Sequence, residues 1–230
     1  MLLVSFNVIL FIGDAMKKWL IFVFLLIVIG LFVFINYPQK VYDAKDFDIE
    51  IIKSDIDYDK DGIDDYSDIL EGAKIEADKK IKYKSAYYEG GYPPDGEGVA
   101  TDVIWRSLKN AGYDLKSLID EDIKNNIDAY PNLEGNIDPN IDFRRVANLK
   151  IFFERHCLVL TNDPYEIDKW MPGDIVAFGS NHIGIISDIR NKDGIPYLIS
   201  LSGNNKMEDD NLIEWYNKRG ITGHYRFLYE

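Results

Sequence analysis

An uncharged apolar run near the N-terminus constrains the architecture of this chain more than any other feature of its sequence. Residues Trp19 to Ile35 read WLIFVFLLIVIGLFVFI, without a charged side chain. As a helix rising about 1.5 Å per residue, this run nearly crosses a hydrocarbon layer about 30 Å thick. Lys17 and Lys18 precede it, and basic residues favour the cytoplasmic side of a span. We therefore predict a single-pass anchor in the cell membrane, with the C-terminal domain outside the cytoplasm.

A cleaved signal peptide is the alternative interpretation of this run. The next residues, Asn36-Tyr37-Pro38-Gln39, contain no small-x-small cleavage motif, and the run is longer than an ordinary signal core of about 7–15 residues. An uncleaved anchor is therefore favoured. A second, shorter apolar stretch lies at Leu2 to Gly13, and Met16 directly precedes the two lysines, so we expect translation to start at Met16.

The composition excludes several broad classes of protein. The 230 residues include 39 Asp and Glu against 26 Lys and Arg, a formal net charge of −13. Most of the surface would therefore repel a phosphate backbone, and no nucleic-acid partner is expected. Cys157 is the only cysteine, which excludes an internal disulfide and a thiolate zinc cluster. A hydrophobic content of 47% is enough for a core of ordinary size.

An acidic segment after the anchor matches the ligand spacing of a one-loop calcium site. In residues 57–68, acids stand at positions one, three, five, nine and twelve, and Gly62 stands at position six, where such a loop turns sharply. Position seven supplies a backbone carbonyl. The last acid is an aspartate in place of the usual glutamate, which shortens its reach. The alternative is a merely acidic surface loop. The expected ligands of a structural Ca²⁺ are Asp57, Asp59, Asp61, Ile63, Asp65 and Asp68.

Periodicity divides the remaining chain into helices followed by strands. Apolar spacing predicts helices over residues 66–80, 99–111, 115–125 and 146–155. A stretch rich in glycine and proline, residues 90–98, is expected to be an irregular loop. Strands are expected over residues 175–178, 183–187 and 197–201, with a hairpin turn at 191–194 and a last strand around 223–226. Helices first and an antiparallel sheet afterwards indicate an α+β domain.

Five blocks of sequence carry a resemblance to a known family. They read GEGVATDV, NIDFRRVANL, PGDIV, HIGIISD and GHYR, and begin at residues 96, 140, 172, 182 and 223. With every block in order over about residues 66–229, the chain resembles the bacterial family DUF1287. That family in turn resembles the papain-like superfamily, which includes cell-wall peptidases and amidases. The resemblance implies a papain-like fold, in which N-terminal helices pack on a C-terminal antiparallel sheet.

These features together predict three parts. Residues 1–40 would form the cytoplasmic end and the transmembrane helix, and residues 41–82 a linker with the calcium-binding-like loop and a helix. Residues 83–230 would form the papain-like domain of the DUF1287 type.

The resemblance also implies a degenerate catalytic site. In papain-like sites a cysteine at a helix N-terminus attacks, a histidine holds its thiolate and later protonates the leaving amine, and a third polar group orients the imidazole. The family cysteine aligns with Ala100, whose methyl group cannot attack a carbonyl. The histidine aligns with His182, and the third position, usually histidine, with Ser200. Loss of the nucleophile alone costs several orders of magnitude in rate. With its nucleophile absent, His182 is also open to a purely structural interpretation.

Other residues are poor replacements for the missing nucleophile. Cys157 directly follows His156, and adjacent helical residues point about 100° apart, so this histidine cannot activate it. A buried structural cysteine is favoured. Thr101 is expected to point away from a site built around position 100. His224, in the last strand, is expected to pack and to form hydrogen bonds.

Three side chains are candidates for contact with a ligand. Arg144 and Arg145 stand out in an acidic domain and suit a carboxylate-bearing ligand such as a cell-wall stem peptide. An internal salt bridge with Asp142 and nearby acids is the favoured alternative. Tyr92, in the loop rich in glycine and proline, is placed to face a ligand in the would-be cleft.

Three functions from different classes remain open. The first is a pseudoenzyme, a membrane-anchored domain that binds a peptide or a peptidoglycan fragment without cleaving it. The second is an active cell-wall amidase or peptidase with an unrecognised nucleophile. The third is a calcium-stabilised surface scaffold. The sequence favours the first.

Overall fold

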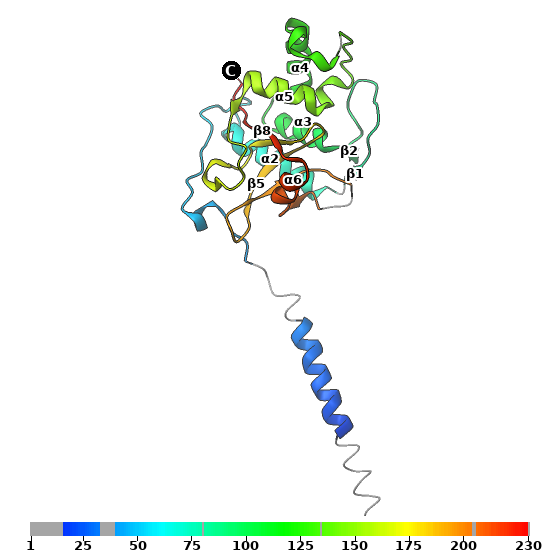
Figure 1. Cartoon of the computed structure of the whole chain (residues 1–230), viewed down its shortest axis with the longest axis vertical. Coiled ribbons are helices and arrows are strands. Elements are labelled where there is room, and N and C mark those ends of the chain that lie inside the picture. Colours follow the sequence, from blue (N-terminus) through cyan, green and yellow to red (C-terminus); the bar gives the residue numbers. More distant parts are fainter. Residues whose placement is uncertain (1–15, 33–39, 80, 134, 204–205, 230) are drawn as a thin grey trace, which may run out of the picture. The chain divides into compact units, whose positions relative to one another are not determined.

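The structure, a computed structural model, describes residues 16–32, 40–79, 81–133, 135–203 and 206–229. Its contacts divide the chain into two units, Met1–Lys40 and Val41–Glu230. In the first unit, residues 16–32 are helical (Figure 1). Across the described ranges, no helix has both the length and the apolar character needed to cross a membrane. The last part of the predicted transmembrane helix, residues 33–35, lies outside the described residues.

The second unit opens with helices close to the predicted ranges. Capping explains two of their starts, because the Asp64 carboxylate accepts from the Ser67 N–H and the Asp114 carboxylate accepts from the Ser117 N–H. Gly112 follows the helix Ala100–Asn110. Its φ of +83° is the left-handed conformation with which many helices end. The helices are α2 (Asp65–Asp78), α3 (Ala100–Asn110), α4 (Leu115–Asn125) and α5 (Val146–His156) (Figure 1).

A six-stranded sheet follows, with the strand order β3-β8-β4-β5-β6-β7 and antiparallel pairing throughout. The expected combination of helices with an antiparallel sheet is therefore confirmed. The hairpin turn expected at residues 191–194 joins β5 to β6, and both edge strands, β3 and β7, are only two residues long. The strands are β3 (Leu158–Val159), β4 (Ile175–Phe178), β5 (His182–Arg190), β6 (Pro196–Ile199), β7 (Glu208–Asp209) and β8 (Ile221–Arg226).

Both faces of the sheet are covered, which explains why β4 is buried along its whole length. Successive strand residues point to opposite faces. Ile175 and Ala177 belong to a core shared with α2, α3, α4 and α5. The alternate residues of β4 belong to a second core, which a short helix, α6 (Leu212–Arg219), covers through Leu212 and Trp215. The sequence did not predict α6.

Helices α2 and α3 are held together by close packing and by polar contacts. A Cβ atom at Gly72 would lie 2.8 Å from the α3 backbone, so the two helices approach backbone to backbone. Arg106 Nη1 lies 3.0 Å from Glu76 Oε2 in a buried ion pair. Asn110 Nδ2 donates to the Asp68 carbonyl at 2.9 Å. These contacts fix the position of α3 along its length.

The stretch expected to be irregular loop contains a short strand. β2 (Glu97–Gly98) pairs in parallel with β1 (Lys82–Tyr83). The Lys82 N–H donates to the Gly96 carbonyl at 2.9 Å, so a distant segment supplies hydrogen bonds that local sequence cannot indicate. Short 3₁₀ helices complete the unit at Ala44–Phe47, Ile127–Ala129, Pro131–Leu133, Asp142–Arg144 and Ile167–Lys169.

A buried carboxylate ties the turn before β4 to β8. Asp174 is 1% exposed and accepts from the Met171 N–H and from Arg226 Nε and Nη2, each at 2.8 Å. His224 Nε2 lies 3.0 Å from Asp174 Oδ2, and the His224 ring stacks on Trp170 with centroids 3.7 Å apart. His224 therefore packs and forms hydrogen bonds, as its sequence position predicted.

The segment preceding α2 packs on the helical part of the same unit. The ring of Tyr58 stacks on Tyr113 with centroids 4.2 Å apart, and Tyr113 Oη donates to Asp65 Oδ2 at 2.5 Å. The stretch expected to be a linker, residues 41–82, thus belongs to the compact unit that contains the sheet.

Candidate functional site

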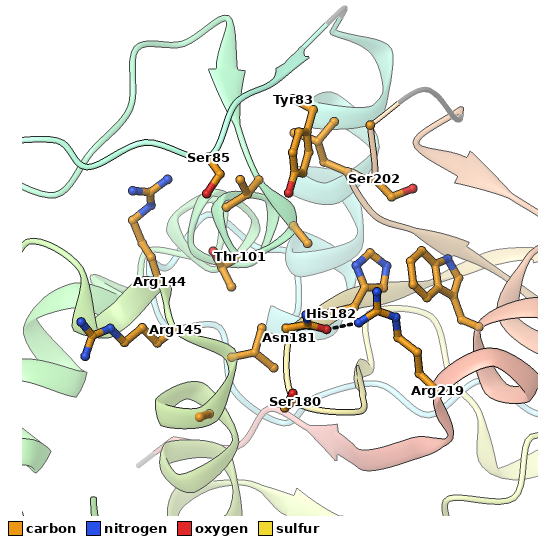
Figure 2. Close-up of a pocket in the computed structure, with 17 residues that line it drawn as sticks. Tyr83, Ser85, Thr101, Arg144, Arg145, Ser180, Asn181, His182, Ser202 and Arg219 are labelled. Atoms are coloured by element: carbon orange, nitrogen blue, oxygen red, sulfur yellow. Dashed lines mark hydrogen bonds between the residues drawn. The ribbon is translucent and has the colours of Figure 1, made fainter. Parts of the chain in front are cut away.

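A cavity of about 660 Å³ opens among the starts of α3, α5 and β5 and the end of α6. Figure 2 shows Thr101 and His182 in the middle of the cavity, with Arg145 on one side and Arg219 on the other. Four of the predicted site residues are thus brought to one cavity, namely Ala100, His182, Arg144 and Arg145. Its lining consists of Tyr83, Ser85, Val99, Ala100, Thr101, Arg144, Arg145, Val146, Ala147, Ser180, Asn181, His182, Leu201, Ser202, Gly203, Trp215 and Arg219.

Ala100 is the first residue of α3 and is 6% exposed. Asp102 builds this helix start, because its Oδ2 accepts from the Val99 N–H at 2.7 Å and its Oδ1 accepts from Trp105 Nε1 at 2.9 Å. The first amides of a helix lack partners within the helix and favour a nearby negative charge. A thiolate at this position would gain from that field. The methyl group of Ala100 offers no nucleophilic atom.

Arg144 supports the same helix start. Its Nε and Nη2 donate to the two carboxylate oxygens of Asp102 at 2.7 and 2.9 Å, and its Nη1 donates to the Ala86 carbonyl at 3.0 Å. The Arg144 side chain is 2% exposed. Its charge is thus neutralised by a buried bidentate pair. The favoured internal salt bridge is present, but the partner of Arg144 is Asp102, and only Arg145 pairs with Asp142.

Two further arginines give the cavity a positive charge. The Arg145 side chain is 45% exposed, and its Nη1 lies 3.2 Å from Asp142 Oδ1. Arg219 is exposed and donates to Asn181 Oδ1, the contact dashed in Figure 2. None of the described lining residues is acidic. In a chain with a net charge of −13, this cavity therefore favours an anionic ligand.

His182 begins β5 and has a fixed ring orientation. The residue is 6% exposed, and its ring stacks on Trp215 with centroids 3.6 Å apart. His182 Nε2 lies 3.0 Å from Ser200 Oγ, which donates to the Ile183 carbonyl at 3.0 Å. A serine hydroxyl carries one proton, so the Nε2–H donates to Ser200 and Nδ1 is left as an acceptor.

The surroundings keep the His182 imidazole uncharged. Burial lowers the pKa of His182 to about 4, and the charges of Arg219 and Lys218 act in the same direction. At neutral pH the ring therefore lacks the positive charge that a cysteine–histidine ion pair requires. It remains a hydrogen-bonding group.

Ser200 is buried and forms a hydrogen bond with the His182 ring. It is 4% exposed and is absent from the described lining of the cavity. Its hydroxyl is engaged by His182 and by the Ile183 carbonyl. Ser200 is therefore a positioning residue, at the place where the family resemblance puts the third catalytic group.

Thr101 lines the cavity, so the expectation that it points away from the site is wrong. The residue is 3% exposed, and its Oγ1 has no hydrogen-bond partner among the described residues. Buried hydroxyl groups nearly always have a partner. Because Oγ1 is itself buried from solvent, Thr101 lines the cavity through its other atoms.

Cys157 and Tyr92 lie elsewhere. Cys157 follows the end of α5, and burial raises the pKa of its thiol to about 12, as expected for an unreactive structural cysteine. The Tyr92 ring packs edge-on against Trp105 and Phe143, and its Oη donates to Asp114 Oδ1 at 3.3 Å. Tyr92 lines a different cavity from that of Ala100 and His182.

Sequence reasoning missed the contribution of α6. Trp215 and Arg219 both line the cavity. A sequence signal for the end of α6 was present, because Lys218 and Arg219 fill its last turn and a glycine, Gly220, follows them.

The acidic loop is a separate feature from the cavity. Three aspartates come together in this loop, namely Asp57, Asp59 and Asp61. Each has one carboxylate oxygen within 4.8 Å of a carboxylate oxygen of the other two. Asp65 accepts from the Tyr58 N–H at 2.9 Å and from Tyr113 Oη at 2.5 Å. The Ile63 N–H donates to Asp61 Oδ1 at 2.8 Å, and Asp68 is 2% exposed in the first turn of α2.

Comparisons with known proteins agree with the family resemblance. The chain is 36% identical over 170 residues to "Uncharacterized protein YijF" of Escherichia coli (strain K12), a match that covers 70% of this chain and 80% of that protein. No solved structure matches the chain significantly. The model of the family described as "Domain of unknown function (DUF1287)" matches residues 70–227. On these matches, the chain belongs to the DUF1287 family.

Proposed function

We propose that this chain is a membrane-anchored, extracytoplasmic domain of papain-like type that binds a carboxylate-bearing peptide or peptidoglycan fragment without cleaving it. One observation carries the proposal: position 100, at the start of α3, and His182 line one electropositive cavity, and the residue at position 100 is alanine. The anchor is supported by the uncharged run Trp19–Ile35 behind Lys17 and Lys18.

The affinity for an anion has two sources in the cavity. Arg145 and Arg219 stand on its two sides (Figure 2). The first residues of α3 and of α5 both line it, so two helix N-termini contribute partial positive charge. A peptide carboxylate can accept bonds from each of these groups.

The absence of cleavage follows from the same residues. No described lining residue carries a thiol, and the thiol of Cys157 is held protonated by burial, which raises its pKa to about 12. The hydrolase alternative needs a hydroxyl nucleophile next to His182, and Ser200 is the residue within hydrogen-bond distance. Ser200 is buried and does not line the cavity, so a substrate carbonyl cannot approach its Oγ.

Calorimetric titration of the full-length chain, in a mild detergent, with a soluble muropeptide tests the proposal. We expect binding that weakens with salt, and a loss of about 10- to 100-fold in affinity when Arg145→Gln or Arg219→Gln removes a charged donor. Lys192→Gln, an exposed charge in the β5–β6 turn, should bind like the wild type.

The same samples distinguish the alternatives. Release of new amine ends from the muropeptide, lost in His182→Ala, would establish a hydrolase and overturn the proposal. No heat of binding to any wall fragment, with the chain folded, would favour the scaffold.

A further inference from the structure

We propose that the loop before α2 is a Ca²⁺ site, formed by the carboxylates of Asp57, Asp59, Asp61 and Asp68 and the backbone carbonyl of Ile63. The proposal is independent of the ligand cavity. Three of its carboxylates come from the loop, and the fourth comes from α2.

The loop has the shape of a cation-binding turn. Gly62, with a φ of +97°, and Lys60, with a φ of +64°, both adopt left-handed backbone conformations. The loop therefore folds tightly on itself, and one oxygen from each of Asp57, Asp59 and Asp61 lies within 4.8 Å of the others. Three negative charges this close repel one another unless a cation lies between them.

Asp68 provides the second, independent observation. It is 2% exposed, and its Oδ2 is buried with no hydrogen-bond partner among the described residues. The Asp68 carbonyl accepts from Asn110 Nδ2 at 2.9 Å, and a Cβ atom at Gly112 would lie 2.8 Å from Asp59 Cβ. Asp68 and the loop therefore both pack against the end of α3, which brings the Asp68 carboxyl to the loop. Buried carboxylates are nearly always paired or coordinate a metal, and a bound cation is the partner that this carboxyl lacks.

Asp65 has a different role in the same site. Its two oxygens are occupied by the Tyr58 N–H and by Tyr113 Oη. The ninth position of such loops often contacts the ion through a water molecule. Asp65 thus anchors the loop to the helical body and does not need to touch the cation directly.

The donor set favours Ca²⁺ over Mg²⁺. Four carboxylates and a carbonyl supply enough oxygen atoms for the six to eight ligands of Ca²⁺, whose geometry is flexible. Mg²⁺ requires a near-ideal octahedron and usually keeps several of its waters. Because Asp68 has a shorter reach than glutamate, we expect weak affinity, with a Kd of about 10⁻⁴ M, as in extracellular modules.

A cation here would stabilise the contact between α2 and α3. The Asp68 carbonyl accepts from Asn110 Nδ2 at 2.9 Å, at the last residue of α3. A Cβ atom at Gly112 would lie 2.8 Å from Asp59 Cβ, so the loop also packs directly behind α3. Binding therefore joins the loop, the first turn of α2 and the end of α3.

The test is calcium titration of the full-length chain in a mild detergent, after removal of metals with a chelator. We expect one site by calorimetry and a rise in Tm. At 10 mM Ca²⁺ and a Kd of about 10⁻⁴ M, the ratio of folded to unfolded chain rises about 100-fold. Mg²⁺ at the same concentration should have a much smaller effect.

Two variants that each remove one negative charge show whether the calcium response depends on Asp68. Asp68→Asn should abolish the calcium response, while its Tm without metal stays equal or rises because a like charge is removed. Asp55→Asn, an exposed acid just before the loop, should respond like the wild type. No heat in the wild type, an equal response to Mg²⁺, a full response in Asp68→Asn, or a lost response in Asp55→Asn would each overturn the proposal.

Discussion

The substitution Ala100→Cys, made in a Cys157→Ala background so that it carries the only thiol, tests whether the start of α3 still favours an anion. A partly buried charge at a helix N-terminus gains about 1–2 kcal/mol, and one pKa unit corresponds to about 1.4 kcal/mol. A thiol with an ordinary pKa of about 8.5 should therefore have a pKa of about 7.5 at this position. The thiolate fraction at pH 7 then rises from roughly 3% to roughly 25%.

The neutral state of His182 limits this shift. An ion-paired cysteine can have a pKa of about 3.5–4, but burial and the charges of Arg219 and Lys218 lower the pKa of His182 to about 4 and disfavour the imidazolium. We therefore expect a moderately activated thiol and no complete ion pair.

The assay is the rate of iodoacetamide alkylation as a function of pH. Lys109→Cys in the same background is the matched control, because it stands in the last turn of α3, where the helix dipole has the opposite sign and raises the pKa of a thiol. A pKa of 8.5 or above at position 100, or equal rates at the two ends of α3, would refute the reasoning.

Three further changes test other parts of the site. The pKa of His182 is about 4 in the folded chain, against an ordinary value of 6.5. Between pH 6.5 and pH 4 the unfolded chain therefore binds more protons than the folded chain. The free energy of unfolding should fall as the pH decreases through this range. The loss is about 3 kcal/mol by linkage, and His182→Gln should remove it in urea unfolding at pH 7 and pH 4. Asp102→Asn leaves the buried Arg144 without its counter-charge and should lower the free energy of unfolding by about 3–5 kcal/mol, measured in the same way. A Cβ atom at Gly184 would lie 2.8 Å from the Ile199 carbonyl, so Gly184→Ala should crowd β5 against β6 and cost about 1–3 kcal/mol, seen as a lower Tm.

For each of these three predictions, one result would contradict the physical reason given. Equal pH dependence in the wild type and in His182→Gln would mean that another group titrates. An unchanged Asp102→Asn protein would mean that the Arg144 charge reaches water, and an unchanged Tm of Gly184→Ala would mean that the strands separate freely.

Apolar periodicity located the long helices and the central strands because these elements bury one face or both. The helix predicted over residues 99–111 is α3, Ala100–Asn110, and the strand predicted over 175–178 is β4. The α6 helix escaped because it has only eight residues, too few for a clear repeat.

The site was predictable only where residues are neighbours in the chain or belong to a family motif. Ala100 and His182 were found in this way. The pairing of Arg144 with Asp102 joins residues 42 positions apart, and the bond from His182 to Ser200 depends on the register of β5 with β6. Such contacts are set by tertiary packing, which no local pattern encodes.

The two edges of the sheet should behave differently in concentrated solution. β7 presents Glu208 and Asp209, and charge on an exposed edge discourages pairing with another molecule. β3 presents Leu158 and Val159, which are 44% and 60% exposed, and only its shortness limits intermolecular strand addition there. Of the two edges, β3 should therefore be the one that adds a strand from another molecule, and Val159→Lys should suppress this pairing.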